Sequence, residues 1–337
     1  MIEIFFPILL SFLVAFIFIN IWTRKAKSIG MIWDDMNKYN RPKVAGSGGV
    51  ICLLAFLTGV FSFVAYITFY QGRTSHLIEI LALLLVVVFA SGIGFIDDLM
   101  GWRSGGLSRR SRLLLLAVAA IPLMAINAGK DTMSLPLLGN ISLGLLYPLF
   151  IIPMGIMGAT ATFNFLAGYN GLEAGQGILI LSAMAFVSFK TGNSWLSIIA
   201  LCMVGALLAF IIYNYYPAKV FPGDSLTYAL GSLIAIMSIL GNFEKIAVFF
   251  FIPYIIETIL KSKGKLVKYS FGKPLKDGEL TMPYDKIYGL EHASIKLIKL
   301  FKIKPTEQRV VWSLWIFQLV IILIGLIVFR KGIFGVG

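Results

Sequence analysis

Apolar runs long enough to cross a lipid bilayer recur along the whole chain. A helix of about 20 apolar residues spans the hydrocarbon core, and ten runs approach that length: 2–22, 48–70, 76–96, 113–129, 142–163, 177–190, 195–213, 224–241, 246–261 and 310–329. We therefore expect an all-α membrane protein with about ten transmembrane helices. Because 58% of the residues are hydrophobic, residues 1–337 are predicted to form a single polytopic membrane domain.

Lys and Arg residues are distributed unevenly among the loops between these spans. Of the 29 Lys and Arg residues, 23 lie in or at the edge of the loops that follow odd-numbered spans. Cytoplasmic loops carry the positive excess in membrane proteins. We therefore expect a multi-pass protein of the cell membrane, with its N-terminus outside and the odd-numbered loops in the cytoplasm. This distribution also accounts for the net charge of +13, so nucleic acid is not expected as a partner.

The five predicted cytoplasmic loops contain polar residues suited to chemistry on phosphates. They cover about 23–47, 97–112, 164–176, 214–223 and 262–309. The polar residues in or beside the first four are Asp34, Asp35, Lys38, Asp97, Asp98, Arg112, Asn164, Asn170, Glu173 and Asp224. Carboxylates beside fixed cations suit a metal-assisted reaction on an anionic substrate, since Mg²⁺ prefers one or two carboxylates plus phosphate oxygens. If the span count holds, these groups share one aqueous face and form a cytoplasmic active site.

Each group also has an interpretation without chemistry. The Asp97-Asp98 pair could be a solvated helix end. Asp35 and Lys38 could form an i,i+3 pair on a helix surface. Asp224 is electrostatically stable near a helix N-terminus whatever its function. The glycines of the segment 46–49 lack the spacing of a phosphate-binding Walker loop and are expected to allow close helix packing.

Other reactive side chains do not form a recognisable site in the sequence. Cys52 and Cys202 lie in apolar runs without a CxxC motif, so two buried free thiols are expected. Glu257 lies inside the ninth span and either reaches water or pairs with Lys261. His292 has no other cytoplasmic histidine near it, and a solvated or interfacial position is expected.

Three motifs, in chain order, resemble those of one enzyme family. They are GFIDD (94–98) followed by an Arg-rich stretch, NFLAGYNGLEAGQ (164–176) and NYYPAKVFPGDSLTY (214–228). They resemble the polyprenyl-phosphate N-acetylhexosamine-1-phosphate transferases of glycosyltransferase family 4, and LKDGELTMPYDKI (275–287) extends the likeness over essentially the whole chain. The likeness is greatest to the branch that makes dolichyl-diphosphate-N-acetylglucosamine for N-glycosylation. The compact length favours an archaeal member.

The resemblance implies a reaction and its partners. The expected enzyme transfers N-acetylglucosamine-1-phosphate (GlcNAc-1-phosphate) from UDP-GlcNAc to a polyprenyl or dolichyl phosphate in the bilayer and releases UMP. The expected cofactor is Mg²⁺, with Mn²⁺ as a substitute. Family members have ten spans and a cytoplasmic active site, and the better-known branches form homodimers.

The resemblance also assigns roles by position. Asn164 and Asp224 match the metal ligands. Asp97 and Asp98 match the acidic pair that activates or positions the lipid phosphate, with Arg112 as a catalytic cation. The expected substrate-binding residues are Asp34, Asp35, Lys38, Gly158, Phe165, Asn170, Glu173 and Lys268, of which Gly158 and Phe165 bound the segment along the lipid-phosphate groove.

This chain departs from the family patterns at two places. Arg112 stands where the eukaryotic branch has Lys, and these cations bind phosphate differently, Arg as a fork and Lys as a point charge. The Arg-His-Arg of the eukaryotic long loop is missing, which makes Lys268 the candidate there.

Three alternatives stay open. One is a bacterial-type transferase that uses undecaprenyl phosphate, although its His-rich motif is absent. A secondary transporter would instead place ionisable groups near mid-membrane, with repeat symmetry. A non-catalytic membrane scaffold is the third.

Overall fold

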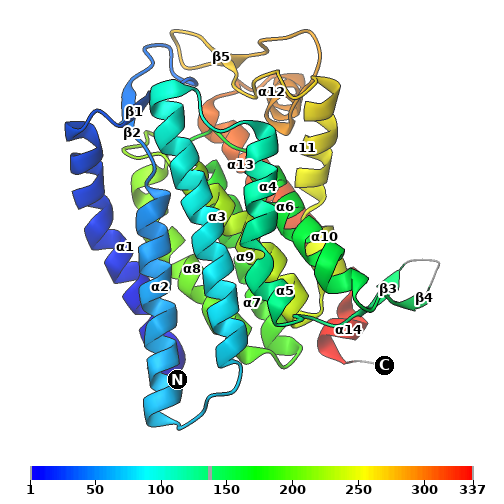
Figure 1. Cartoon of the computed structure of the whole chain (residues 1–337). Helices are drawn as coiled ribbons and strands as arrows, with labels where there is room; N and C mark the ends of the chain where they lie inside the picture. Colours follow the sequence, from blue (N-terminus) through cyan, green and yellow to red (C-terminus); the bar gives the residue numbers. More distant parts are fainter. Residues whose placement is uncertain (1, 136–138, 336–337) are drawn as a thin grey trace.

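The computed structural model describes residues 2–135 and 139–335, which form a bundle of long helices with three short β-ribbons (Figure 1). In this part of the chain, seven helices are long and apolar enough to cross a membrane. They are α1 (Ile2–Ser28), α2 (Gly49–Ala65, continued by the π-helix Tyr66–Tyr70), α3 (Leu77–Ser104), α7 (Leu172–Lys190), α8 (Ser194–Asn214), α9 (Gly223–Gly241) and α13 (Glu307–Val328). The expected all-α membrane fold is confirmed.

The other three predicted spans are helical but divided into shorter pieces. They are α4 (Arg109–Ala119) with α5 (Ile121–Ala125), the π-helix Tyr147–Ile151 with α6 (Ile152–Phe163), and α10 (Glu244–Phe250) with α11 (Ile252–Lys263). The second helix of each pair has a proline in its first turn. Proline lacks a backbone N–H donor, so it is tolerated at a helix start and interrupts a longer helix. The count of ten membrane-crossing helices therefore stays a prediction.

The five predicted cytoplasmic loops all begin or end inside helices, as two of them illustrate. Helix α3 continues to Ser104 and α4 begins at Arg109, so Asp97 and Asp98 are helical residues. The predicted loop 97–112 is therefore wrong except at residues 105–108. The helix stops only where Gly105 and Gly106 adopt positive φ angles of 92° and 79°, a conformation that glycine adopts at low cost. Helix α7 similarly begins at Leu172, so the end of the predicted loop 164–176 is helical. The length of an apolar run predicts only the part of a helix that lies in lipid. Both α3 and α7 extend beyond that part into polar sequence.

Helix α9 lies at the centre of the bundle, and nearly all of its residues are buried. It packs against α2, α3, α6, α7 and α10. The close contacts require glycine: a Cβ added at Gly49 would lie 2.4 Å from the backbone N of Leu226, and one at Gly231 would lie 2.6 Å from Cα of Thr160. The expectation that the 46–49 glycines allow close packing is thus confirmed at Gly49.

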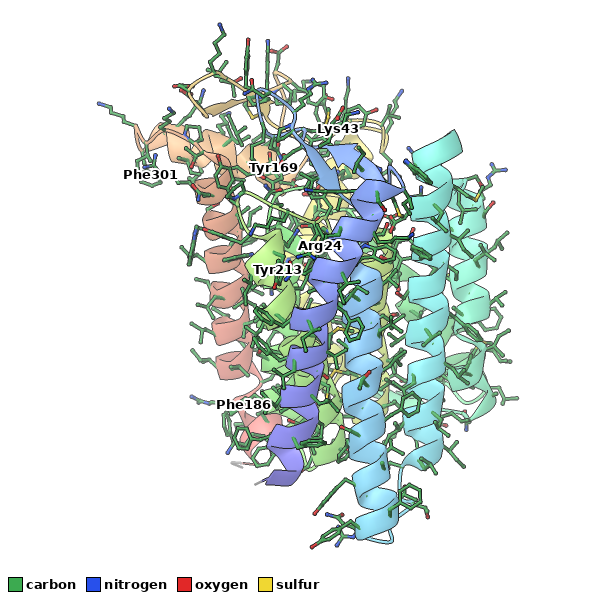
Figure 2. The ribbon with its side chains drawn as sticks, turned by 90° about the vertical axis from the view of Figure 1, so that its left-hand side faces the viewer. Arg24, Lys43, Tyr169, Phe186, Tyr213 and Phe301 are labelled. Carbon is green, nitrogen blue, oxygen red and sulfur yellow. The ribbon has the colours of Figure 1, made fainter. Side chains whose placement is uncertain are left out.

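The small elements gather at the two ends of the bundle. At one end lie the antiparallel ribbon β1 (Ile32–Asp34) and β2 (Lys43–Ala45), the ribbon β5 (Lys273–Pro274) and β6 (Leu280–Thr281), and helix α12 (Leu290–Leu300). The start of α1, the ribbon β3 (Thr132–Leu135) and β4 (Gly139–Ser142), and helix α14 (Arg330–Phe334) lie at the other end. Figure 2 shows Lys43 and Tyr169 near the first end and Phe186 near the second. The assignment of the first end to the cytoplasm stays a prediction.

Candidate active site

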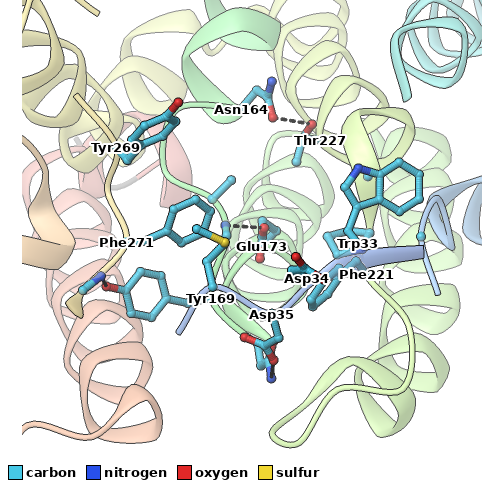
Figure 3. Close-up of a pocket in the computed structure, with 18 of the residues that line it drawn as sticks. Trp33, Asp34, Asp35, Asn164, Tyr169, Glu173, Phe221, Thr227, Tyr269 and Phe271 are labelled. Carbon is cyan, nitrogen blue, oxygen red and sulfur yellow. Dashed lines mark hydrogen bonds between the residues drawn. The ribbon is translucent and has the colours of Figure 1, made fainter. Parts of the chain in front are cut away.

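A pocket of about 870 Å³ lies at the end that carries β1, β2, β5 and β6 (Figure 3). Residues from all five predicted polar segments line it, so the expected convergence of these segments is observed. Seven of the predicted site residues are in the lining: Asp34, Asp35, Asp98, Asn164, Asn170, Glu173 and Asp224.

Asp98 connects three parts of the chain at the pocket wall. Its Oδ1 accepts a hydrogen bond from the backbone N of Asp224 at 2.8 Å. Its Oδ2 accepts from the hydroxyl of Ser47 at 2.8 Å and from the backbone N of Ser225 at 3.4 Å. Gly223 is required here, because it has φ +71° and an added Cβ would lie 2.2 Å from Asp98 Oδ2. Asp98 therefore fixes the end of α3 against the start of α9 and the first loop.

Asp97 has a different environment from its neighbour. It is buried and does not line the pocket. Its Oδ2 lies 2.8 Å from Arg112 Nη2, and its Oδ1 accepts from the backbone N of Leu107 at 2.6 Å. Arg112 also approaches Asp224, with 3.8 Å between Nη1 and Oδ2. Asp97 thus holds Arg112 in place, and only Asp98 of the acidic pair faces the pocket.

A threonine that the motif analysis did not select joins the two predicted metal ligands. Thr227 Oγ1 donates to Asn164 Oδ1 at 3.0 Å and lies 3.2 Å from the backbone oxygen of Asp224 (Figure 3). Asn164 follows the end of α6, and Asp224 is in the first turn of α9, as predicted. The two oxygen donors therefore belong to one wall of the pocket. The only signal in the sequence is the three-residue spacing from Asp224, about one helical turn.

The first and third loops meet in a buried network of charges. Lys38 Nζ contacts Asp35 Oδ2 at 2.8 Å and also bonds to Glu307 Oε2. Asn170 donates from its backbone N to Glu307 Oε1 at 2.8 Å and from Nδ2 to Asp35 Oδ2 at 3.1 Å. The predicted pair of Asp35 and Lys38 exists, but it is buried in a turn rather than displayed on a helix surface. Glu307 was not selected from the sequence, since it begins a distant helix.

Glu173 lines the pocket and has one carboxyl oxygen without a hydrogen-bond partner in the part of the chain that the structure describes. Its Oε1 accepts from the backbone N of Gly168 at 2.7 Å (Figure 3). Its Oε2 is buried and has no hydrogen-bond partner among the described residues. Such an atom can accept a hydrogen bond from a polar ligand.

Four predicted substrate-binding residues lie outside the lining: Lys38, whose contacts are given above, and Lys268, Gly158 and Phe165. Lys268 is exposed, with Nζ 4.8 Å from the ring centre of Tyr284, which does line the pocket. Gly158 is exposed on α6, and Phe165 is half-buried just after it. The cations in the described lining are instead Arg41 and Lys273, neither of which any motif indicated.

The charges of the lining fit a divalent cation. The lining has five acids and two bases among its described residues, so an anionic substrate needs additional positive charge. The described residues include no group of three or more His, Cys, Asp or Glu side chains that could hold a metal ion. Asp224 and Asn164 would therefore share the ion with oxygens of the substrate, which is the coordination that Mg²⁺ favours.

Sequence comparisons connect this site to known proteins. A protein of Saccharolobus solfataricus, provisionally assigned as a UDP-N-acetylglucosamine–dolichyl-phosphate N-acetylglucosaminephosphotransferase, is 33% identical over 328 residues, 96% of each chain. The model for glycosyl transferase family 4 matches residues 80–242, which include α6, α9 and most of α3. The chain belongs to glycosyl transferase family 4. The family resemblance noted in the sequence is confirmed.

Two further relatives have names that describe related activities. The UDP-N-acetylglucosamine–dolichyl-phosphate N-acetylglucosaminephosphotransferase of Dictyostelium discoideum is 30% identical over 272 residues, 69% of this chain and 64% of the relative. A phospho-N-acetylmuramoyl-pentapeptide-transferase of Halalkalibacterium halodurans is 31% identical over 235 residues, 65% of this chain and 70% of the relative. The expected archaeal source is consistent with the Saccharolobus relative.

Proposed function

We propose that this protein transfers GlcNAc-1-phosphate from UDP-GlcNAc to a dolichyl or related polyprenyl phosphate, releasing UMP, as the first step of lipid-linked oligosaccharide assembly. The observation that carries the proposal is the position of Asp98, Asn164 and Asp224 in one pocket, at the ends of membrane helices. A lipid phosphate cannot leave the bilayer and a nucleotide sugar cannot enter it. The reaction therefore requires a site at their shared boundary, such as this one.

The proposed step is a single displacement at phosphorus. An oxygen of the lipid phosphate attacks the phosphorus that carries the sugar, and the bond from that phosphorus to the bridging oxygen breaks. UMP departs with the electron pair, and no proton transfer is needed because the second pKa of a phosphate monoester is about 6. Strong general-base catalysis is consequently unnecessary. A two-step route through a covalent aspartyl phosphate is the alternative.

The residues in the pocket lining, and Asp97 and Arg112 beside it, have distinct roles in this proposal. Asp98 orients the start of α9 and the attacking phosphate, and Arg112, held by Asp97, offsets charge on the phosphoryl oxygens. Asn164 and Asp224 would hold Mg²⁺, which supplies positive charge for the diphosphate when bound. The nucleotide sugar lies against the first and third loops, where Glu173 provides the free acceptor.

The bacterial alternative is disfavoured by the lining. No histidine lines the pocket among the described residues, so a His-rich nucleotide-sugar site of the bacterial kind is not formed there. A secondary transporter is disfavoured because Asp98 and Asp224 lie near the ends of α3 and α9 rather than at mid-span.

The test is a transfer assay with defined substrates. Purified protein is incubated with radiolabelled UDP-GlcNAc, Mg²⁺ and either dolichyl phosphate or undecaprenyl phosphate, and the organic phase is analysed. Label in a GlcNAc-diphosphate lipid, with dolichyl phosphate preferred, is the expected result. Chelation by EDTA should abolish the product, and Mg²⁺ or Mn²⁺ should restore it. Absence of a lipid product with both acceptors, or full activity in EDTA, would contradict the proposal.

The long loop provides a comparison of two lysines. Lys273 lines the pocket, whereas Lys268 is exposed and packs over Tyr284. We expect Lys273→Ala to raise KM for UDP-GlcNAc by about tenfold, because a cation facing the diphosphate is lost. Lys268→Ala should change KM by less than about threefold. Initial rates at varied UDP-GlcNAc concentration measure both effects, and a larger effect at Lys268 would restore the assignment made from the motifs.

A further inference from the structure

Two acids that the proposed reaction does not use are buried together where α11 meets α12, the helix inside the predicted long loop 262–309. Glu257 on α11 and Glu291 on α12 have no exposed surface. Glu257 Oε2 accepts from the backbone N of Leu290 at 2.6 Å, and its Oε1 lies 3.7 Å from Lys261 Nζ. Neither carboxyl oxygen of Glu291 has a hydrogen-bond partner among the described residues. The pairing of Glu257 with Lys261 answers the alternative left open by the sequence, but it leaves Glu291 uncompensated.

Gly289 shows how close these groups are. A Cβ added there would lie 2.7 Å from Glu291 Oε2, 3.1 Å from Glu257 Oε1 and 3.2 Å from the hydroxyl oxygen of Ser270. Two carboxyl groups and one hydroxyl therefore surround a single point. These two carboxyl oxygens therefore lie within about 6 Å of each other. Two negative charges that close have a large cost in a buried environment.

This cluster lies behind one wall of the pocket. Tyr269, Phe271 and Gly272 line the pocket, whereas Ser270 is buried beside the two acids. The hydroxyl of Tyr169 donates to the backbone oxygen of Ser270 at 3.3 Å and accepts from the backbone N of Gly272 at 3.0 Å. We refer to residues 269–272 as the pocket wall. Tyr169, which also lines the pocket, bonds to this wall. The acid cluster lies beside Ser270, the buried residue of the wall, whose hydroxyl has no hydrogen-bond partner among the described residues.

If both acids of the cluster were ionised, their two negative charges would be paired with one positive charge. Among the described residues, Lys261 is the one cation that pairs with either acid, so two carboxylates would leave this group with a net charge of −1. His292, the residue after Glu291, was expected in a solvated or interfacial position, but it is buried. Burial lowers the pKa of its imidazole. Burial raises the pKa of Tyr169 well above its ordinary value, so this hydroxyl stays neutral. Burial, and next the charge of Glu257, raise the pKa of Glu291 well above its ordinary value.

We propose that Glu257 and Glu291 share one proton and that this protonated pair positions the pocket wall for nucleotide-sugar binding. Both are positioning residues, since neither lines the pocket. The inference deepens the proposed function, on which its kinetic readout rests. Because the shared proton is held below the raised pKa and lost above it, the wall is ordered at lower pH and loosened as the pH rises. KM for UDP-GlcNAc should increase with pH, whereas kcat should not.

The decisive variant is Glu291→Gln, which keeps the size of the side chain and cannot ionise. In the wild-type protein we expect KM for UDP-GlcNAc to rise at least about fivefold between neutral pH and about pH 9. Buried glutamates with pKa values of about 8–9 are documented, so the shared proton should be lost in this interval. In Glu291→Gln, this rise should fall below about twofold. Glu291→Asp, which can still ionise, should retain it. Glu279→Gln is the matched control, because Glu279 pairs with Lys299 on the same loop and lies outside the pocket lining. A pH dependence of KM unchanged in Glu291→Gln would overturn the proposal.

An infrared measurement separates this inference from the proposed activity. The wild-type spectrum minus that of Glu291→Gln at neutral pH should contain the band of a protonated carboxyl group, and the band should disappear as the pH rises. Its presence in a protein that lacks transfer activity would support the pair while refuting the function. Its absence would refute the pair while leaving the function intact. If Glu291→Gln does not fold, the wild-type spectrum at high pH serves as the reference, and Ser270→Ala provides the test, since loss of the hydroxyl should displace the pH at which the band disappears.

Discussion

Replacing Asp224 by Asn is expected to reduce transfer of GlcNAc-1-phosphate by about 10³-fold, the scale of losing a principal electrostatic contact in a transition state. The substitution removes the negative charge that would hold the divalent cation and leaves the side-chain volume unchanged. The backbone N of Asp224 still donates to Asp98, so the start of α9 keeps its position. The measurement is kcat/KM for lipid product in the organic phase, at saturating Mg²⁺.

The matched control for this prediction is Asp277→Asn. Asp277 is an exposed acid of the long loop that pairs with Lys304 at 2.9 Å and lies outside the pocket lining. Its substitution should leave kcat/KM within about twofold of wild type. Equal thermal unfolding of both variants in detergent would establish that the loss at Asp224 is chemical. Near-normal turnover by Asp224→Asn would remove Asp224 from the proposed metal site.

Gly94→Ala is expected to reduce activity by about 100-fold, the effect of displacing reacting groups by about 1 Å. A Cβ at this position would lie 2.3 Å from the backbone oxygen of Asp224 and 2.8 Å from the backbone N of Ser225. Backbone atoms of a buried helix cannot rotate away, so α3 and α9 must separate where Asp98 bonds to Asp224. Overpacking of this kind also costs ~1–3 kcal/mol of stability.

Gly92→Ala is a close control for the same helix. Nothing lies within 4 Å of a Cβ added at Gly92, so this variant tests the general effect of Gly→Ala in α3 without the clash. It should retain wild-type activity and an equal or higher unfolding temperature, since Ala favours the helix by about 1 kcal/mol. Equal activity of the two variants would show that close contact of α3 and α9 is not needed for transfer.

The fold was predictable from the sequence where lipid alone determines the pattern. Apolar length predicted α8 and α9 to within one residue at each end, because a helix in hydrocarbon must be both apolar and long. It could not predict where α3 ends, since the helix leaves the apolar region and stops at Gly105. Apolar length also did not predict the interruptions of the three divided spans, because an apolar run that contains a proline still has the length and composition of one span.

Site residues were predictable from the sequence where they lie within one motif. Contacts between residues that are far apart in the sequence were not. Asp98 and Asp224 were both selected, but their contact joins residues 126 positions apart. Glu307 and Lys273 were missed, since their roles depend on how the last loop and α13 fold over the pocket. The sequence likewise could not separate Asp97 from Asp98, because adjacent helical residues differ only in the direction that they face.

The central claim is that phosphorus, and not the sugar alone, moves to the lipid. The most direct test is transfer from UDP-GlcNAc labelled with ³²P at the sugar-linked phosphate, compared with the same compound labelled at the uridine-linked phosphate. The first label is expected in the lipid product and the second in UMP. Retention of the sugar-linked label in UDP, with sugar alone on the lipid, would contradict the claim.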